Sequence, residues 1–449
     1  MGTSCLESRP LLQDLKVTIH ESSMVFPSKK SNDEKKSLFL SNIDKALNFD
    51  VETIHFFASN KDFPPQKVTE MFKKSLEDAL VVYELLAGRL KLNSKTNRLE
   101  IDCNAEGAGF VVASCEYKLS EIGDLVYPNP AFAQFVHKSK DYLNPGDQPL
   151  CVAQLTSFKC GGFAIGFTTS HTTFDGLSFK TFLDNLAALA TNKPLAVTPC
   201  HDRHLLAARS PPHVTFSHPE LIKLKNLSTD QESNVFKAFR EELNFKVFQL
   251  TSNNILSLKE KAKGSTGSCV SRFNVITTHI WRCKALSAPS YDPAKSSTIL
   301  YAVDIRSRLN PPLPREYAGN AVLTAYATTN CGELEKGPLS RLVEMVREGA
   351  TRMSDEYVRS IVDWGELNDG FPHGDVLVSS WWRLGFEEVE YPWGKPKYCC
   401  PVVYHQKDIV LVFPPFVGGD CGDEDGINII VALPPKEMEK FEKLFYTLA

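Results

Sequence analysis

Apolar residues recur every three or four positions in several segments, the spacing that places side chains on one face of a helix. From Val68, the segment VTEMFKKSLEDALVVYELLAGRL carries such a face and reaches a stop signal at Gly88; its apolar positions are Phe72, Leu76, Ala79, Leu80 and Tyr83. Similar faces occur in SFKTFLDNLAALA and PKEMEKFEKLF, at Phe179, Phe182, Leu183 and Leu186, and at Met438, Phe441 and Phe445. NNILSLKEKAKG and FNVITTHIWRCKAL are also predicted to be helical.

Other segments have the alternating or continuous apolar pattern of strands. RLEIDCNAEGAGFVVASC alternates and breaks at glycines, which indicates strands joined by a tight turn. CVAQLTSF and FAIGFTTS flank Cys160, Gly161 and Gly162, the pattern of a hairpin. The second of these strands runs into His171 and a predicted helix follows, so HTTFDG lies on a strand-to-helix turn. Strands are also predicted at STILYAVDI, LVSSWWRL and DIVLVFPP.

The distribution of prolines divides the chain. A length of 449 residues exceeds what one hydrophobic core usually supports, so two domains of about 200 residues are expected. Between about 195 and 235 the sequence excludes long helices and central strands, with prolines at Pro194, Pro199, Pro211, Pro212 and Pro219. We therefore predict a domain over residues 1–195, a linker over 196–235 and a second domain over 236–449, with a cleft between the domains.

Charge and composition exclude several classes of partner. Lys and Arg (50) nearly balance Asp and Glu (54), and a formal net charge of -4 provides no basic field for a nucleic acid. No apolar run approaches the roughly 20 residues of a membrane span, and the first residues, MGTSCLESRP, lack the apolar core of a secretory signal. Twelve cysteines at scattered spacings, without a CxxC pair, predict free thiols. We expect a cytoplasmic monomer.

His171 and Asp175 form a His-x-x-x-Asp motif on the predicted strand-to-helix turn. Alone, this spacing is a weak signal, because it occurs by chance in many proteins where both residues are structural. The turn strengthens it, since an imidazole at the end of an anchored strand can face a cleft, and Gly176 permits an unusual backbone conformation. A histidine that titrates near neutrality suits proton abstraction from a hydroxyl group.

Several blocks of the sequence resemble one family. HTTFDG is similar to the HxxxDG signature of the plant BAHD acyl-CoA-dependent acyltransferases. Three flanking blocks are similar to that family's other conserved segments and occur in the same order: LLAGRLKLNSKTNRLEIDCNAEGAGF, VDIRSRLNPPLPREYAGNAV and SSWWRLGFEEVEYPWGKP. The resemblance implies an α/β fold of two similar chloramphenicol-acetyltransferase-like domains, each a mixed sheet flanked by helices, joined by a long crossover loop. It also implies acyl-CoA as co-substrate, with no permanently bound cofactor.

The resemblance assigns expected roles to individual residues. His171 would be the general base that deprotonates the acceptor and later protonates the departing thiolate. Trp381 and Ser379 match the positions that the family places near the developing oxyanion. Asp175 matches a residue that points away from the substrate and pairs with an arginine, which we identify as Arg306. Donor and acceptor would enter a tunnel between the domains from opposite ends.

One block departs from the family pattern. Where the family has DFGWG, this sequence has EYPWG, with Glu390, Trp393 and Gly394 at the matching positions and Pro392 in place of a glycine. In members of the family this block lies away from the catalytic histidine and is regarded as structural. Proline cannot adopt positive φ and lacks a backbone donor, so we expect the loop geometry to differ.

Other residue clusters have a simpler structural interpretation. Cys200, His201, Asp202 and His204 could suggest a metal site, but without a second ligand cluster at zinc-like spacing we expect a solvent-facing linker and no metal. Cys421 lies in the acidic stretch GGDCGDEDG, where neighbouring acids would raise its pKa and disfavour a nucleophile. Lysines and arginines that could meet CoA phosphates, or simply be surface charges, are Lys261, Lys263 and Arg272.

These observations leave three functions to compare. The leading hypothesis is transfer of an aromatic, hydroxycinnamoyl-type acyl group from CoA to a hydroxyl acceptor in plant specialised metabolism. An intramolecular variant would lactonise an ortho-hydroxycinnamoyl-CoA to a coumarin, and the altered EYPWG block gives this weak support. A different class of function is a non-catalytic relative that acts as a protein partner in lipid elongation. The intact pair His171 and Asp175 disfavours that last hypothesis, because a partner would not need it.

Overall fold

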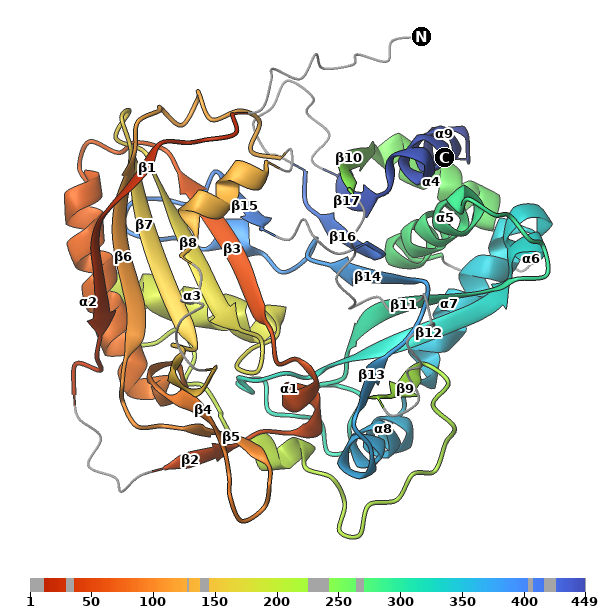
Figure 1. The fold of residues 1–449 in the computed structure, drawn as a ribbon, viewed down its shortest axis with the longest axis horizontal. Coiled ribbons are helices and arrows are strands. Elements are labelled where there is room, and N and C mark those ends of the chain that lie inside the picture. Colours follow the sequence, from red (N-terminus) through yellow and green to blue (C-terminus); the bar gives the residue numbers. More distant parts are fainter. Residues whose placement is uncertain are drawn as a thin grey trace.

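The structure is a computed structural model that describes residues 12–29, 36–126, 129–137, 145–224, 242–263, 270–402, 407–415 and 425–448. These residues form two halves, each built around a six-stranded mixed sheet. Figure 1 shows the N-terminal half in red to yellow and the C-terminal half in green to blue. The predicted α/β architecture with two sheet-containing domains is therefore confirmed.

The N-terminal sheet includes one strand from the other end of the chain. Its order is β1-β6-β7-β8-β3-β15, in which only β6 and β7 are parallel neighbours. The strands are β1 (Val17–Val25), β6 (Ala108–Cys115), β7 (Cys151–Phe158), β8 (Phe163–Ser170), β3 (Asp50–Phe57) and β15 (Tyr398–Pro401). Because β15 completes this sheet, the two halves are linked by backbone hydrogen bonds as well as by the linker. A smaller sheet joins β2 (Ser37–Phe39), β5 (Leu99–Asp102) and β4 (Arg89–Leu92).

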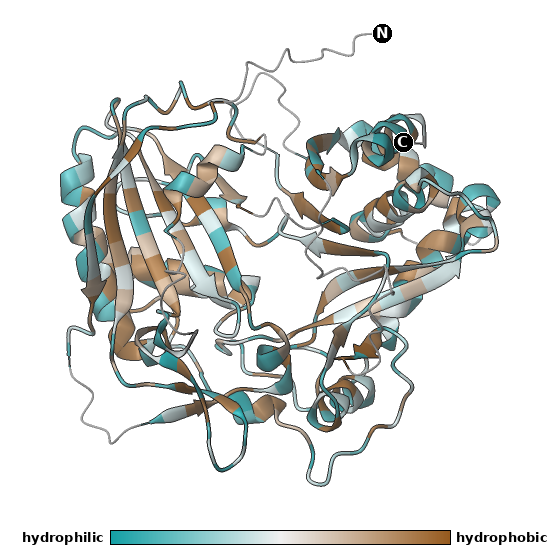
Figure 2. Cartoon of the chain, in the orientation of Figure 1, coloured by the Kyte–Doolittle hydropathy of each residue, from teal (hydrophilic) through white to brown (hydrophobic). Residues whose placement is uncertain are grey.

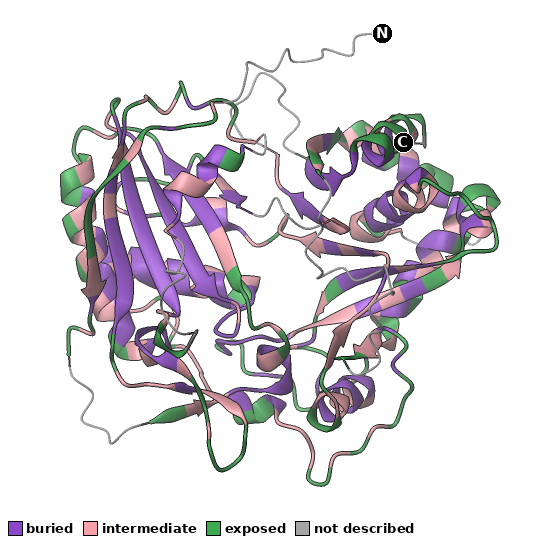
Figure 3. Cartoon of the chain, in the orientation of Figure 1, coloured by how far each residue is buried: buried purple, intermediate pink, exposed green. Residues whose placement is uncertain are grey.

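Helices α2 (Pro65–Val82) and α3 (Gly176–Ala190) cover one face of the N-terminal sheet. The apolar faces predicted from the sequence are the buried faces, as Phe72 and Leu76 on α2 and Phe182 and Leu186 on α3 are fully buried. Proline at the first position of α2 is preorganised for a helix start. Figure 3 shows β7 and β8 buried almost throughout. Such burial requires cover on both faces of the sheet.

The C-terminal sheet has the order β10-β17-β16-β14-β11-β12. Its strands are β10 (Asn244–Leu250), β17 (Ile427–Leu433), β16 (Ile409–Phe413), β14 (Val376–Ser380), β11 (Ser296–Asp304) and β12 (Val322–Asn330). One face packs against α4 (Ser252–Ala262), α5 (Arg272–Ser287), α7 (Leu339–Arg352) and α9 (Pro435–Leu448), and the short α6 (Cys331–Lys336) follows β12. In Figure 2 the hydrophobic residues follow the strands, while the outer surfaces of the helices are hydrophilic.

The second face of each sheet contributes to a shared core between the halves. Ile54 and Phe56 of β3 lie in one apolar cluster with Leu411 and Phe413 of β16 and Ile430 of β17. Alternate residues of β3, such as Phe57, belong instead to the helix-covered core. The strand β8, which leads to His171, therefore lies next to the interface between the two sheets.

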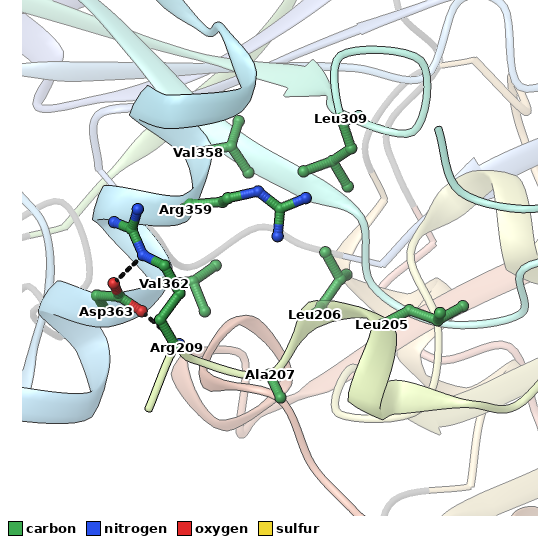
Figure 4. A pocket seen from close by; sticks show the side chains of 9 residues that line it. All are labelled: Leu205, Leu206, Ala207, Arg209, Leu309, Val358, Arg359, Val362 and Asp363. Atoms are coloured by element: carbon green, nitrogen blue, oxygen red, sulfur yellow. Dashed lines mark hydrogen bonds and ion pairs between the residues drawn. The ribbon is translucent and has the colours of Figure 1, made fainter. Parts of the chain in front are cut away.

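The linker packs against both halves and lies at the lower edge of the molecule in Figure 1. Its short helical turn η4 (Arg203–Leu206) lies near α1 (Asn42–Ala46) and α8 (Asp355–Leu367), and apolar residues of the three segments share one cluster. Further along, β9 (Leu221–Lys223) pairs with β13 (Gly370–Pro372). A small cavity lies where η4 meets α8 (Figure 4). Within the described part of the linker, no long helix or central strand forms, in agreement with its prolines.

Two further findings concern the described residues as a group. No helix among them is both long enough and apolar enough to cross a membrane. The cysteines in these residues are free thiols. Cys399 packs toward the helix-covered core and Cys400 toward the shared core, so the two neighbours point to opposite faces of β15.

Candidate active site

His171 begins the turn that connects β8 to α3. Its backbone N–H donates to the carbonyl oxygen of Phe49 at 2.8 Å, which continues the pairing of β8 with β3. The Phe49 ring contacts the imidazole edge-on, with centroids 5.2 Å apart. His171 is half-buried, and the backbone is anchored while the ring remains partly accessible. The predicted strand-to-helix placement is confirmed.

A buried asparagine from the C-terminal half holds the imidazole. Asn320 Oδ1 lies 3.1 Å from His171 Nδ1, and Asn320 Nδ2 donates to the His171 carbonyl oxygen at 2.7 Å. The same Nδ2 group donates to Asp44 Oδ1 at 2.8 Å, and both Asn320 and Asp44 are fully buried. Sequence reasoning assigned neither residue a role. Asn320 lies in the YAGN part of the block that resembles the family, which is the only signal that marks it.

The environment of His171 favours the neutral imidazole. Burial lowers the pKa of His171 below its ordinary value, because removal from water disfavours the charged form. The His171 carbonyl, the nearby Asp175 charge, the hydrogen bond to Asn320 and the Asp44 charge partly oppose this shift. A neutral ring at neutral pH can accept a proton, which is what a general base must do.

Asp175 closes the turn and does not contact the imidazole by a hydrogen bond. Its carboxylate caps α3 by accepting from the Ser178 backbone N–H at 2.9 Å. The second oxygen accepts from the Ala321 N–H at 2.9 Å and lies 2.9 Å from Arg306 Nη1. The predicted pair of Asp175 and Arg306 is therefore present. Since Ala321 follows Asn320, this carboxylate also fixes the segment that holds His171.

Arg203 brings the linker beneath the same turn. Its side chain is fully buried, and Nη2 donates to the Thr173 carbonyl oxygen at 2.7 Å. Nε lies 3.9 Å from Asp44 Oδ2. The guanidinium passes so close to Gly319 that a Cβ there would lie 1.1 Å from Nη1. Glycine at 319 is therefore a steric requirement, and the YAGN segment packs directly on the linker arginine.

Ser379 and Trp381 lie at the end of β14, on the side of the C-terminal sheet that faces the N-terminal half. Ser379 is paired in parallel register with Leu411, which belongs to the shared core. The backbone N–H of Trp381 donates to the Val412 carbonyl oxygen at 2.6 Å, and the Trp381 ring contacts Phe386 edge-on with centroids 5.7 Å apart. Within the described chain, neither residue forms a hydrogen bond or ring contact with His171. Both residues therefore lie on the sheet face that borders the shared core, and their role near the oxyanion stays a prediction.

The EYPWG block lies far from His171. Trp393 is buried, stacks on Tyr391 with centroids 5.0 Å apart, and contacts Phe163 at the opposite end of β8. Eight residues of strand separate the two ends by about 25 Å, in agreement with a structural role for the block. Gly394 N–H donates to the Tyr391 carbonyl at 3.0 Å, so Pro392 occupies the second position of a turn, which suits its fixed φ.

The two remaining residues of the block are exposed. Glu390 lies at the surface, and so does Gly394, which has a φ of 113°. No atom lies within 4 Å of where a Gly394 Cβ would be, so glycine is needed there for its backbone conformation rather than for space. The positive φ of this loop is thus carried by Gly394 and not by Pro392.

The linker residues considered for a metal do not converge. His201 Nε2 is 2.9 Å from the Val82 carbonyl oxygen, whereas the His204 ring stacks on Phe39 at 4.6 Å. Burial lowers the pKa of His201 to about 4. In the described ranges, no group of three or more His, Cys, Asp or Glu side chains is arranged to hold a metal ion. Cys421 lies outside the described residues.

The basic residues considered for CoA lie around the start of α5. Lys261 is in the last turn of α4, and Lys263 pairs with the neighbouring Glu260. Arg272 begins α5, lies over the Trp382 ring at 5.7 Å and contacts Asp425 at 3.1 Å. Because Trp382 follows Trp381, Arg272 lies close to the end of β14.

A second group of residues resembles the Ser–His–acid triad of a nucleophilic enzyme, but its serine cannot react with a substrate. Ser360 Oγ lies 2.8 Å from His218 Nε2, and His218 Nδ1 lies 3.2 Å from Glu220 Oε1. All three side chains are buried, and Ser360 Oγ also accepts from the backbone N–H groups of Thr215 and Phe216. A hydroxyl oxygen with both lone pairs occupied cannot attack a substrate. The hydrogen bonds of this group join the linker to Ser360 of α8 and have a structural role.

Comparisons with known proteins agree with this geometry. The model of the Transferase family matches residues 15–448. "Acyltransferase GLAUCE" of Arabidopsis thaliana is 58% identical over 453 residues, covering 99% of this chain and 99% of that protein. "Fatty alcohol:caffeoyl-CoA acyltransferase", also of Arabidopsis thaliana, is 32% identical over 439 residues, covering 96% and 98%. The crystal structure of vinorine synthase has the same fold, with a TM-score of 0.76, 24% identity and coverage of 97% and 98%.

The matched family, the relatives that span almost the whole chain, and the His-x-x-x-Asp turn between two mixed sheets point to the same conclusion. The resemblance predicted from the sequence is confirmed. The chain belongs to the BAHD acyltransferase family and is an acyl-CoA-dependent transferase.

Proposed function

We propose that the enzyme transfers an aromatic, hydroxycinnamoyl-type acyl group from CoA to a hydroxyl acceptor, with His171 as general base. The observation that carries this proposal is the held imidazole: His171 is half-buried, bonded to Asn320, and has a pKa lowered by burial. The hydroxycinnamoyl donor is supported by the name of the relative that acts with caffeoyl-CoA and a fatty alcohol.

The proposed reaction needs two proton transfers, both at the His171 imidazole. The His171 nitrogen that does not face Asn320 takes the hydroxyl proton as the acceptor oxygen attacks the thioester carbonyl carbon. The tetrahedral intermediate carries negative charge on the former carbonyl oxygen, toward which the Trp381 indole N–H and the Ser379 hydroxyl would donate. Collapse breaks the C–S bond, and the imidazolium returns its proton to the CoA thiolate. Asp175 keeps the turn in place with Arg306 and does not touch the reacting atoms.

A panel of acyl-CoA donors tests the reaction class. Purified enzyme would be incubated with caffeoyl-, feruloyl-, benzoyl- and acetyl-CoA, with and without long-chain and aromatic alcohols, and the released CoA thiol would be measured. We expect release that depends on an alcohol and is fastest with the hydroxycinnamoyl donors. Thiol release from ortho-hydroxycinnamoyl-CoA without an acceptor would instead favour lactonisation, with the coumarin detected directly. Absence of release with every donor would contradict the proposal.

The pH dependence of kcat/KM should report the lowered pKa of His171. Protonation of the imidazole removes the base, so activity falls as the pH drops through that pKa. Because burial lowers the pKa, we expect the acid limb to lie below the value of about 6.5 for a free histidine. Circular dichroism at each pH would check that the fold is intact. This control is needed because burial also lowers the pKa of His201 and His279 to about 4, and their protonation at low pH would destabilise the fold. A limb at or above about 6.5 would contradict the assignment.

Removal of the indole N–H at Trp381 tests the oxyanion role. Trp381→Phe keeps an aromatic ring, and we expect it to lower kcat by about 10²- to 10³-fold with acyl-CoA binding almost unchanged. Ser379→Ala should cost less, because the remaining donor and water share the charge. Trp281→Phe is the matched control, since it deletes an indole N–H bonded to Ser297 at 3.0 Å within the C-terminal core. Wild-type turnover of Trp381→Phe at saturating acyl-CoA would show that the indole only packs.

A further inference from the structure

The carboxylate of Asp44 is bonded more extensively than its position in a short helix requires. Its Oδ2 atom closes the capping box of α1 by accepting from Ser41 N at 2.9 Å and from Ser41 Oγ at 2.8 Å. Its Oδ1 atom points to the other half of the molecule and accepts from Asn320 Nδ2 at 2.8 Å. The cap accounts for one oxygen only, so the second needs a separate explanation.

The two acceptors around Asn320 Nδ2 determine which way its carboxamide points. Nδ2 faces the Asp44 carboxylate and the His171 carbonyl oxygen, at 2.8 and 2.7 Å. Neither group has a proton to donate, so a carboxamide turned by half a rotation would place its own oxygen against two acceptors. Asn320 is fully buried, and no water can relieve such a clash at low cost. The orientation with Oδ1 toward His171 is therefore the only one in which every polar atom is paired.

This orientation determines the proton position on the imidazole. An amide oxygen only accepts, so the Asn320 Oδ1 that lies 3.1 Å from His171 Nδ1 requires a proton on that nitrogen. A neutral imidazole carries one ring proton, which leaves the lone pair on Nε2. We propose that Asp44 is a positioning residue which, through Asn320, holds His171 in the tautomer whose Nε2 is free to accept the acceptor's proton. This inference rests on the proposed role of His171 as base.

The charge of Asp44 adds a second effect during turnover. When Nε2 takes a proton, the ring becomes an imidazolium, and a buried anion one hydrogen-bonded residue away stabilises it. The other charged groups near the ring are Asp175, which is paired with Arg306, and Arg203, which lies 3.9 Å from Asp44. Asp44 therefore acts both through the orientation of Asn320 and through its charge.

Asp44→Asn tests the proposal at constant side-chain size. An amide at 44 can donate as well as accept, so only the His171 carbonyl oxygen still opposes a turned Asn320 carboxamide. The turned carboxamide then costs less, and the Nε2-protonated tautomer becomes more accessible. We expect kcat to fall by at least about 10-fold, but by less than the roughly 10⁴-fold loss known for a carboxylate bonded directly to a catalytic histidine, with little change in acyl-CoA affinity. The acid limb of the pH profile should move to lower pH, because the anion that favours the imidazolium is lost. A kcat within about threefold of wild type, or a loss that leaves the acid limb in place, would overturn the proposal.

Asp363→Asn is the matched control for loss of a buried carboxylate. Asp363 lies on α8, its side chain is almost fully buried, and it accepts from Arg209 Nε at 2.6 Å (Figure 4). We expect this variant to lower the melting temperature while kcat and the acid limb of the folded enzyme stay at their wild-type values. A shift of the acid limb in this control would show that the limb reports general destabilisation, and the proposal would lose its support.

A measurement on the wild-type protein avoids any folding defect of the variants. In enzyme labelled with ¹⁵N histidine, His171 would be assigned by comparison with His171→Gln. Above the pKa of His171 we expect Nδ1 to show the shift of a protonated ring nitrogen and Nε2 that of an unprotonated one. A protonated Nε2 would overturn the inference. If His171→Ala kept its turnover, the proposed function would fail while this spectrum would still decide the tautomer.

Discussion

Replacement of His171 by alanine should remove the chemistry and leave the fold. We expect His171→Ala to lower kcat by about 10²- to 10⁴-fold, the usual contribution of a general base. The melting temperature should change little, because the ring is half-buried and its backbone bond to Phe49 is retained. Acyl-CoA affinity, measured by equilibrium binding, should also stay near the wild-type value, since the imidazole acts on the acceptor's proton.

His279 provides the matched control for this experiment. It is a buried histidine whose pKa burial lowers to about 4, and it packs against Phe445 with ring centroids 4.7 Å apart. His279→Ala should lower the melting temperature and leave the kcat of the folded enzyme unchanged, the reverse of the result for His171→Ala. If His171→Ala retained more than about a tenth of the wild-type turnover, His171 would not be the general base.

The secondary structure around the site could be predicted because the pattern is local. The apolar face of α3 and the continuous apolar run of β8 leave one place for His171, at the turn between them. The same reasoning located α2 and α9, whose predicted faces are buried. In these segments buried side chains recur with the same period as the helix or strand itself. A window of about fifteen residues is therefore enough to predict the element and its buried face.

The position of β15 could not be predicted from its sequence. The strand is four residues long, and its partner β3 lies more than three hundred positions earlier, with Cys400 paired to Ile54. Short apolar segments fit many sheet edges equally well, and the choice depends on the packing of both halves. The YCCP segment therefore carries no local signal that it completes the N-terminal sheet.

The residues that hold His171 in place could not be predicted from local sequence for a related reason. Arg306 could be predicted as the partner of Asp175 only through the resemblance to the family, and the pair is present. Asn320 and Asp44 hold His171 through hydrogen bonds between residues 149 and 276 positions apart. An asparagine beside glycine and an aspartate in a capping box have ordinary local explanations. Only the three-dimensional arrangement shows that they also serve the imidazole.

Loss of the Asp175 charge should reduce stability and activity together. The carboxylate is buried and accepts from Arg306, from Ser178 N and from Ala321 N. Asp175→Asn replaces one acceptor oxygen with a donor, so at least one of these partners loses its bond. The Arg306 charge then keeps only Asp304, a more exposed carboxylate 3.0 Å from Nη1, as its counter-ion. Breaking a buried pair in this way costs about 3 to 5 kcal/mol. We expect a clear fall in melting temperature and a parallel loss of kcat, measured on the same preparation.

The exposed ion pair of Asp355 and Arg359 provides the control. It shows whether the losses in Asp175→Asn come from the buried position of that pair or would follow the loss of any ion pair. Its Nε–Oδ1 distance is 3.0 Å, close to that of the pair in the active site, but about a third of each side chain is exposed. Asp355→Asn should therefore cost at most about 1 kcal/mol and leave turnover unchanged. If Asp175→Asn kept the wild-type melting temperature while its activity vanished, the carboxylate would act on the reacting atoms. The ordering role that its contacts with Arg306 and Ala321 support would then be wrong.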